Sequence, residues 1–282
     1  MTSNNCCIIF QIKLIQFNLK YNEVSVLLTL THREPPNVLK LLANEVRWQL
    51  LSLLAYSDYR VNELSILLQK PMNLISYHLR LLRTEAIVQE HRSNADARDV
   101  YYSLDLTQFE GLYKAAVESL HPALAQPTPS ADAQAATDIR PPTRVLFLCT
   151  HNSARSQLAE ALLRHLGGER VAAFSAGTEV TQVRPEVLAV LEKNNIDATG
   201  LYSKHLDQFL GQDFDYVITV CDNASEACPI FPGDPERIHW SLPDPSAVKG
   251  EQRYMAFVDV FAALEKRLKL FLTVIDQKRG AA

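Results

Sequence analysis

Apolar residues recur at helical spacing soon after residue 37. Within 38–55 these positions are Leu39, Leu42, Val46, Leu50, Leu53 and Leu54. Their period predicts one amphipathic helix over 38–55, and the same pattern predicts a short helix over 61–68. Pro71 then forces a turn, because proline cannot continue a helix. Asn73 suits the N-cap of a third helix over 74–84.

The pattern changes after Ala86. The segments 87–92 (IVQEHR) and 99–104 (DVYYSL) are typical of strands, and the polar stretch SNADAR joins them. Helical spacing returns over 107–120. The resulting order is that of a winged helix-turn-helix, mostly α with a β wing.

Residues 37–120 resemble the ArsR-type repressors, which are small dimeric regulators that respond to metals and metalloids. The resemblance is carried by LLANEVRWQLLSLL, NELSILL, LISYHLRLLRTEAIV and VYYSL. It implies a domain that binds promoter DNA and forms a homodimer through its terminal helices, here 107–120 with part of 22–31. A helical dimerisation module that does not bind DNA remains the alternative.

The third helix and the wing hold the candidate DNA-binding residues. Side chains in the middle of such a helix meet base edges, and basic side chains on the wing meet phosphates. The candidates are Lys70, Ser76, Tyr77, His78, Arg80, Arg83, Arg92 and Arg98.

Many members of that family sense metalloids through a cysteine pair at the start of the recognition-motif helix. That stretch is VNELS (61–65) in this chain and holds no cysteine. Cys6 and Cys7 are an alternative pair of thiolates for trivalent arsenic, which is a soft ion, or they are incidental.

The segment 121–142 is rich in Pro, Ala, Ser and Thr and has few large apolar residues. Such a segment cannot bury enough surface to fold and is therefore predicted to be a flexible linker. The chain divides into an N-terminal extension (1–36) of unassigned role, a winged-helix domain (37–120), the linker (121–142) and a C-terminal domain (143–282). We expect the two domains to move independently.

The C-terminal domain begins with a short apolar run, RVLFL, that predicts a buried strand ending at Cys149. A loop follows, then a helical pattern, with Arg155 six residues after Cys149. A strand, a Cys-x5-Arg loop and a helix form the phosphate loop of cysteine-dependent phosphatases. Backbone N–H groups and the helix dipole favour a tetrahedral oxyanion in such a loop, and we expect them to lower the pKa of the Cys149 thiol. The remaining loop residues are Thr150, His151, Asn152, Ser153, Ala154 and Ser156.

Roles for three of these residues follow from their chemistry. The Arg155 guanidinium can grip two oxygens of the anion. We expect Asn152 and Ser156 to hold the loop and to hydrogen-bond the Cys149 sulfur.

Asp244-Pro245 lies late in the chain in WSLPDPS. Alone, an Asp-Pro pair predicts a turn. Together with the Cys149 loop it favours a general acid that protonates a leaving oxygen.

A second buried-strand run (214–220) ends at Cys221, and Cys228 follows in a polar loop where we expect it to be exposed. A phosphatase needs one cysteine, so two more favour thiol exchange. Buried cysteines that act as small hydrophobic residues are the alternative.

Residues 144–280 resemble the arsenate reductases of the low-molecular-weight phosphatase type, especially the thioredoxin-coupled class with three essential cysteines. The resemblance is carried by CTHNSARSQLAEALL, FSAGT, FDYVITVCDNASEACPIFPG and IHWSLPDPS. Tyrosine phosphatases of this type usually have a second cysteine in the loop and an aromatic residue after Asp-Pro. This chain has neither, since Ser246 follows Pro245.

The resemblance implies a three-layer α/β fold with a four-stranded parallel sheet. It implies that Cys149 attacks arsenate, that Cys221 and Cys228 relay the disulfide, and that thioredoxin is the electron donor, with no tightly bound cofactor or metal. Some relatives bind potassium near the loop through an Asn, a Glu, a Ser and an Asp. Asn152, Glu160 and Ser175 match three of these, and the Lys204 ammonium is predicted to replace the ion. A phosphatase or a non-catalytic oxyanion sensor built on the same loop remains an alternative.

The composition of the chain limits these interpretations of fold and function. The 282 residues suffice for two domains, and 47 % are hydrophobic. A net charge of −4 gives no overall basic signal, so DNA binding requires a local patch. The odd count of five cysteines favours a reducing compartment. No apolar run approaches the roughly 18 residues of a membrane span, and the start of the chain lacks the basic region of a signal peptide. These features predict a cytoplasmic protein that does not contact a membrane.

Overall fold

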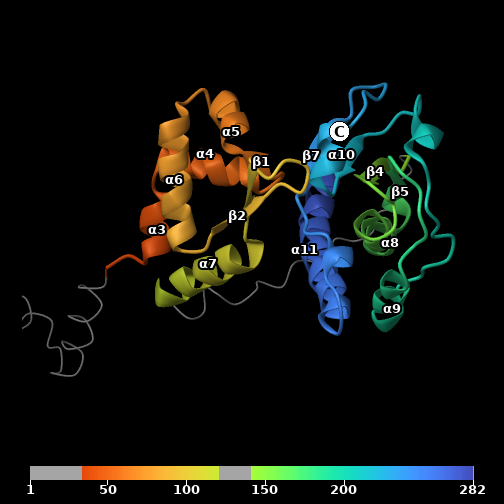
Figure 1. Cartoon of the computed structure of the whole chain (residues 1–282). Coiled ribbons are helices and arrows are strands. Elements are labelled where there is room, and N and C mark those ends of the chain that lie inside the picture. Colours follow the sequence, from red (N-terminus) through yellow and green to blue (C-terminus); the bar gives the residue numbers. More distant parts are fainter. Residues whose placement is uncertain (1–33, 121–140, 282) are drawn as a thin grey trace, which may run out of the picture.

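The structure is a computed structural model that describes residues 34–120 and 141–281 (Figure 1). The described residues form two bodies that lie side by side, one of helices with a small sheet and one built on a parallel sheet. Cys6, Cys7 and nearly all of the predicted extension and linker lie outside the described residues. No helix in the two described ranges is long and apolar enough to cross a membrane.

The N-terminal body contains the predicted helices and strands in the predicted order, with the first helix divided in two and one additional two-residue strand. These are α3 (Asn37–Leu42), α4 (Glu45–Leu54), β1 (Tyr59–Arg60), α5 (Val61–Leu68), α6 (Met72–Thr84), β2 (Val88–Arg92), β3 (Val100–Leu104) and α7 (Leu106–Leu120). The three strands form an antiparallel sheet in the order β1-β3-β2, and β2 and β3 coincide with the two strand segments predicted over 87–92 and 99–104. The core residues Leu50, Leu64, Ile75 and Leu82 are fully buried.

Two local predictions in this body are wrong. The helix expected over 38–55 is broken, because the Asn44 side chain accepts a hydrogen bond from the Arg47 amide (3.2 Å) and starts a new helix there. The third helix begins at Met72 and its N-cap is Pro71 instead of Asn73. Proline is tolerated at a helix start because the first N–H groups there have no partner within the helix.

The C-terminal body is a parallel sheet in the order β5-β4-β6-β7. Its elements are β4 (Thr143–Cys149), α8 (Arg155–Gly167), β5 (Val171–Gly177), α9 (Pro185–Lys193), β6 (Tyr216–Thr219), α10 (Asp222–Glu226), β7 (Glu236–His239) and α11 (Gln252–Ala281). Three short 3-10 helices, η2 (Gly168–Arg170), η3 (Leu206–Phe209) and η4 (Pro245–Ala247), lie in the connections. Helix α8 is buried from Arg155 to Leu163 and packs against β4, β5 and α11. This is the expected four-stranded parallel α/β fold.

The two bodies are joined by direct contacts between buried groups, so the expectation that they move independently is wrong for the described residues. The Asp58 amide donates to the His239 carbonyl (2.7 Å), and the Ser241 amide donates to the Asp58 carboxylate (2.7 Å). That carboxylate also pairs with Arg267 of α11 at 3.1 Å. Asp58 is 1 % exposed, so these partners take the place of water around its carboxylate.

Candidate active site

The oxyanion loop lies between β4 and α8, as the sequence predicts. Strand β4 ends at Cys149, and α8 begins at Arg155. Asn152 has a positive φ of 46°, which curls the loop back toward the sulfur. Its backbone N–H donates to Cys149 Sγ at 3.1 Å, and Ser156 Oγ lies 2.8 Å from the same sulfur. The loop therefore presents the Cys149 sulfur with two hydrogen-bonding groups at the start of a helix.

A glycine allows a second segment to approach this loop. A Cβ atom at Gly177 would lie 2.6 Å from the Thr150 carbonyl oxygen and 2.7 Å from the Asn152 nitrogen. Only a residue without a side chain fits there. The glycine of FSAGT thus fixes the end of β5 against the oxyanion loop.

Arg155 and Asp244 face each other across a cavity of about 200 Å³ above Cys149. The Arg155 guanidinium donates to the Leu242 carbonyl (2.9 Å), and its second nitrogen lies 3.9 Å from the Asp244 carboxylate. The Asp244 side chain also accepts from the Ser246 amide (3.0 Å) and caps η4. Asp244 is therefore both the turn residue and the carboxyl group over the cavity.

Arg184 also lines this cavity and was not among the residues that the sequence singled out. Its amide donates to the Ser153 carbonyl at 2.9 Å and seats α9 beside the loop. It precedes the proline that starts α9, and no local spacing marks it as a site residue. It adds a second arginine to the residues that line the oxyanion cavity.

The pKa of the Cys149 thiol is raised, in contrast to the expectation. Burial of the sulfur is the main cause, and the neighbouring Cys221 thiol adds to it. Hydrogen bonds from Ser156 and Asn152 and the charge of Arg155 act in the opposite direction. The N–H groups and the helix dipole at the loop were expected to lower this pKa. Cys149 is only 4 % exposed, however, and its burial has the larger effect.

Cys221 reaches the same edge of the sheet as Cys149. Strands β4 and β6 are parallel neighbours, with Leu148 opposite Thr219. Thr150 Oγ1, next to Cys149, lies 3.4 Å from Cys221 Sγ. The structure thus places Cys221 beside the oxyanion loop.

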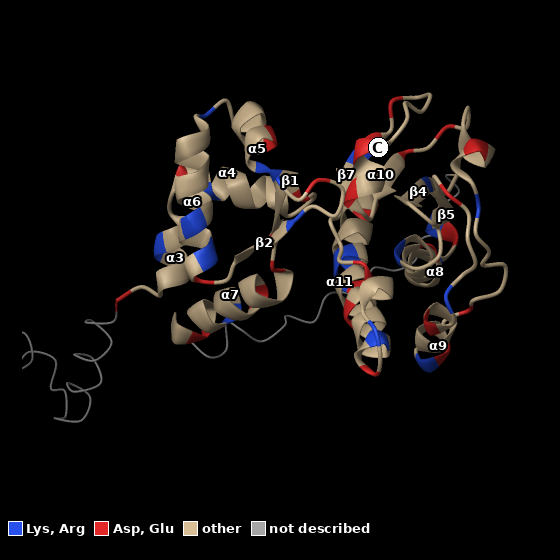
Figure 2. Ribbon diagram, in the orientation of Figure 1, with Lys and Arg blue, Asp and Glu red and all other residues tan. Residues whose placement is uncertain are grey.

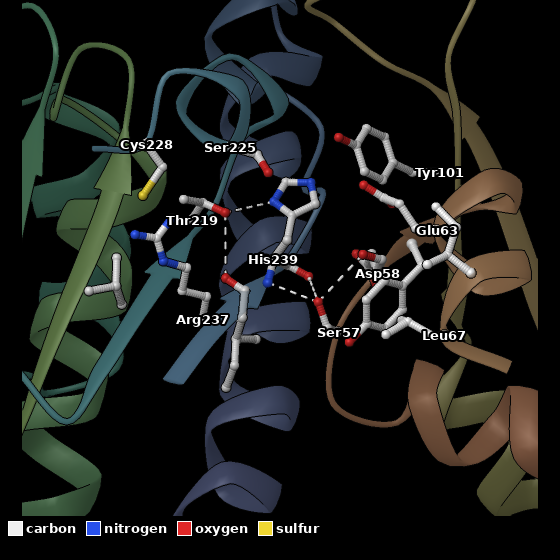
Figure 3. Close-up of a pocket in the computed structure, with 14 residues that line it drawn as sticks. Ser57, Asp58, Glu63, Leu67, Tyr101, Thr219, Ser225, Cys228, Arg237 and His239 are labelled. Atoms are coloured by element: carbon white, nitrogen blue, oxygen red, sulfur yellow. Dashed lines mark hydrogen bonds between the residues drawn. The ribbon is translucent and has the colours of Figure 1, made fainter. Parts of the chain in front are cut away.

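Cys228 lies beyond the far end of α10 and is half-buried, not fully exposed as expected. It packs against the main core and lines a cavity of about 350 Å³ between the two bodies (Figure 3). Burial raises the pKa of its thiol, and Arg237 partly offsets this. All three described cysteines are free thiols.

The residues suggested for a cation site form one buried cluster. Lys204 Nζ lies 3.0 Å from the Glu160 carboxylate, and Ser175 Oγ donates to the same carboxylate at 2.5 Å. Asn152 donates to Ser175 (2.8 Å) and accepts from the Lys204 amide (2.7 Å). Lys204 is 5 % exposed, so its ammonium is buried beside the Glu160 carboxylate.

The candidate DNA-binding residues are separated by the structure into two groups. Ser76, Tyr77 and Arg80 are exposed on α6, whose basic positions are seen in Figure 2. His78 is 6 % exposed and faces the core, so it cannot reach a base edge. It lies one position after Tyr77, on the inner face of an amphipathic helix.

The other basic candidates have partners within their own body. Arg83 pairs with Glu90 (2.6 Å), Arg98 pairs with Asp96 (2.6 Å), and Arg92 donates to a carbonyl of the wing loop. Lys70 lies in the turn before α6 and is partly buried.

The fold and the site define an enzyme of the low-molecular-weight phosphatase class. The family model described as low molecular weight phosphotyrosine protein phosphatase matches residues 144–281. The curated proteins that are similar to this chain include arsenate reductases. The one from Halalkalibacterium halodurans is 36 % identical over 129 residues, which are 45 % of this chain and 93 % of the relative. The one from Bacillus subtilis is 33 % identical over 129 residues, with the same coverage of each chain.

Solved structures match the same part of the chain. A thioredoxin-dependent arsenate reductase of Corynebacterium glutamicum is 28 % identical and covers 49 % of this chain and 64 % of its own, with a TM-score of 0.40. An arsenate reductase from Archaeoglobus fulgidus is 33 % identical and covers 46 % of this chain and 98 % of its own, with a TM-score of 0.38. On the sequence relationships, the chain belongs through its C-terminal body to the arsenate reductases of the low-molecular-weight phosphatase family.

Proposed function

We propose that the chain is a bifunctional arsenic-detoxification protein. Its C-terminal body reduces arsenate to arsenite through Cys149 and a Cys221/Cys228 disulfide relay, and its N-terminal body is a winged-helix regulator that binds promoter DNA. The observation that supports the reductase most strongly is the position of Cys221, whose sulfur lies 3.4 Å from the residue next to Cys149. A phosphatase of this fold needs no second thiol there.

The first chemical step joins arsenate to Cys149. Arsenate has the shape of phosphate, and the loop N–H groups with Arg155 bind its oxygens. The Cys149 thiolate attacks arsenic, while Asp244 protonates the oxygen that leaves as water. Binding of a tetrahedral anion beside Arg184 and Arg155 is compatible with the charge of this cavity.

The second step transfers two electrons. The Cys221 thiolate attacks the sulfur of Cys149, the sulfur–arsenic bond breaks, and its electron pair remains on arsenic, which leaves as arsenite. Cys228 then attacks Cys221 and releases the Cys149 thiolate, so that a Cys221–Cys228 disulfide remains. A dithiol reductant, which we take to be thioredoxin, reduces this disulfide by exchange. Such exchange requires a reducing compartment, and we therefore infer a cytoplasmic location.

Lys204 is proposed to take the place of a bound cation. Its ammonium balances the Glu160 carboxylate, and that cluster holds Asn152, whose amide contacts the Cys149 sulfur. The predicted consequence is a loop that needs no potassium.

The reductase is tested by arsenate-dependent oxidation of NADPH in the presence of thioredoxin and thioredoxin reductase. The full chain should turn over. Cys149→Ser should abolish both this activity and any hydrolysis of p-nitrophenyl phosphate. Cys221→Ser and Cys228→Ser should abolish only the first. Equal loss of hydrolysis in all three variants would make Cys221 and Cys228 structural.

The DNA-binding half rests on the order of its elements and on the exposed face of α6, with Ser76, Tyr77 and Arg80. We propose a homodimer through α7, with part of 22–31, which lies outside the described residues. Fluorescence anisotropy with DNA upstream of the gene should show binding that weakens steeply with salt, because phosphate contacts dominate. Arg80→Ala should weaken DNA binding. His78→Gln should remove no contact to a base, because His78 faces the core. Sedimentation that shows a monomer would contradict the dimer.

A further inference from the structure

A buried carboxylate directly follows Cys221. Asp222 is the first residue of α10 and is 1 % exposed. Its oxygens accept hydrogen bonds from the Asn94 amide (2.9 Å), from Ser241 Oγ and from His239 Nε2 (3.2 Å). Burial opposes ionisation, but the bonds from His239, Ser241 and Asn94 outweigh it and lower the pKa of Asp222 to about 2. The first residue of α10 is therefore a charged carboxylate that accepts hydrogen bonds from three donors.

One of these donors belongs to the other body. Asn94 lies in the wing loop (93–99) that joins β2 to β3. His91 of β2 supports a second donor, since its Nε2 hydrogen-bonds Ser241 Oγ. The His91 ring also stacks on Tyr101, whose own ring lies 4.7 Å from that of His239 (Figure 3). The wing thus packs on the N-terminal end of α10 through polar and aromatic contacts.

The relay cannot operate while α10 remains helical. Cys221 is its N-cap, and Cys228 follows its C-cap Ala227. Seven residues at the helical rise span about 10 Å, whereas the Cα atoms of a disulfide lie at most about 7 Å apart. Formation of the Cys221–Cys228 bond therefore requires α10 to unwind, and Asp222 must move with it.

We propose that the wing loop acts as a clamp, by which we mean that it holds α10, the helix between Cys221 and Cys228, in its helical form. The Asn94 amide, acting through Asp222, and His91, acting through Ser241, are positioning groups that hold α10 in the dithiol form. Formation of the Cys221–Cys228 disulfide breaks these contacts and releases the wing loop. The inference rests on the proposed relay, and it deepens it by making the N-terminal body part of the redox cycle. Because such coupling is reciprocal, a wing pulled away from α10 also favours the disulfide.

The test measures the dithiol–disulfide equilibrium of Cys221 and Cys228 in the full chain. Cys6, Cys7 and Cys149 are changed to serine so that only this pair responds to buffers of reduced and oxidised glutathione. Oxidised glutathione accepts the two electrons, and the two thiol protons pass to the two glutathione thiols. Asn94→Pro removes the amide donor, and Asn94→Ala is the matched control that keeps it.

A hydrogen bond from an amide to a charged acceptor changes an equilibrium about tenfold or more. We expect Asn94→Pro to favour the disulfide by about tenfold, which lowers the reduction potential by about 30 mV. Asn94→Ala should match the parent. His91→Phe keeps the aromatic ring but loses the bond to Ser241, and it should shift the equilibrium in the same direction.

A second readout follows the wing itself. Amide hydrogen exchange of 93–99 should rise when the parent pair is oxidised. Equal potentials in the Asn94→Pro and Asn94→Ala proteins, with unchanged exchange on oxidation, would overturn the clamp. If Asn94→Pro does not fold, the potential of His91→Phe decides: a parent-like value overturns the clamp. A parent pair that never forms the disulfide would instead overturn the relay on which the clamp rests.

Discussion

Replacement of Asp58 by alanine should separate the two bodies. The Asp58 side chain has no exposed surface, and Arg267, its partner at 3.1 Å, is only 15 % exposed. Asp58 also accepts the Ser241 amide, so its loss leaves a buried guanidinium and a buried N–H without their acceptor. Breaking a buried pair in this way costs about 3–5 kcal/mol. This loss of free energy is larger than the contribution of an exposed ion pair between the bodies.

The control is an exposed ion pair that joins the same two bodies. Lys266 Nζ lies 3.0 Å from Glu110, whose side chain is 74 % exposed. Glu110→Ala should cost between about 0 and 1 kcal/mol, as is usual for surface pairs. Both ion pairs connect α11 to the N-terminal body, and the two pairs differ chiefly in burial.

The assay is urea unfolding followed by tryptophan emission. Trp240 reports the contact between the bodies, because its Nε1 donates to the Tyr56 carbonyl at 3.1 Å. Trp48→Phe removes the other tryptophan. Asp58→Ala should move the Trp240 transition to much lower urea, and Glu110→Ala should leave it in place. Equal shifts in the two variants would refute the conclusion that buried Asp58 holds the bodies together.

Three further predictions concern the site. Lys204→Met leaves Glu160 with Arg164 as its only cation among the described contacts, and it should lower the free energy of unfolding by about 3 kcal/mol in thermal unfolding. Strong stimulation of the parent enzyme by potassium at constant ionic strength would contradict the proposal that Lys204 replaces a bound cation. Arg184→Ala should raise the KM for arsenate about tenfold through loss of one charge-assisted contact, with kcat less affected; an unchanged KM would remove it from the site. Alkylation of Cys149 by iodoacetamide should rise with pH, and Cys221→Ser should shift the midpoint to lower pH, because the Cys221 side chain raises the pKa of Cys149. An unshifted midpoint would show that the two side chains do not interact.

The parts of the site that local spacing defines were predictable. A strand that ends at Cys149, a loop and a helix that starts at Arg155 place the nucleophile and the guanidinium within seven residues of chain. The same holds for Cys221, because a buried run directly before it predicts a strand that ends at the same edge. Periodicity likewise predicted the helix over 61–68, the helix over 107–120 and the two strand segments of the N-terminal body.

Residues whose role depends on distant contacts could not be predicted in this way. Arg184 lines the cavity because its backbone N–H bonds to the oxyanion loop, a contact that no local spacing reveals. The burial of Cys149 raises its pKa, which the loop motif alone does not reveal. Asp58 and Asp222 were not singled out from the sequence, because their burial depends on the contact between the two bodies.

The most direct test of the account is a single turnover without thioredoxin. The fully reduced chain is mixed with excess arsenate, and arsenite and the disulfides are quantified by peptide mass mapping. We predict one arsenite per chain together with a Cys221–Cys228 disulfide, and a Cys149–Cys221 disulfide when Cys228→Ser is used. Absence of arsenite, or its release with a disulfide that does not include Cys221, would contradict the proposed relay.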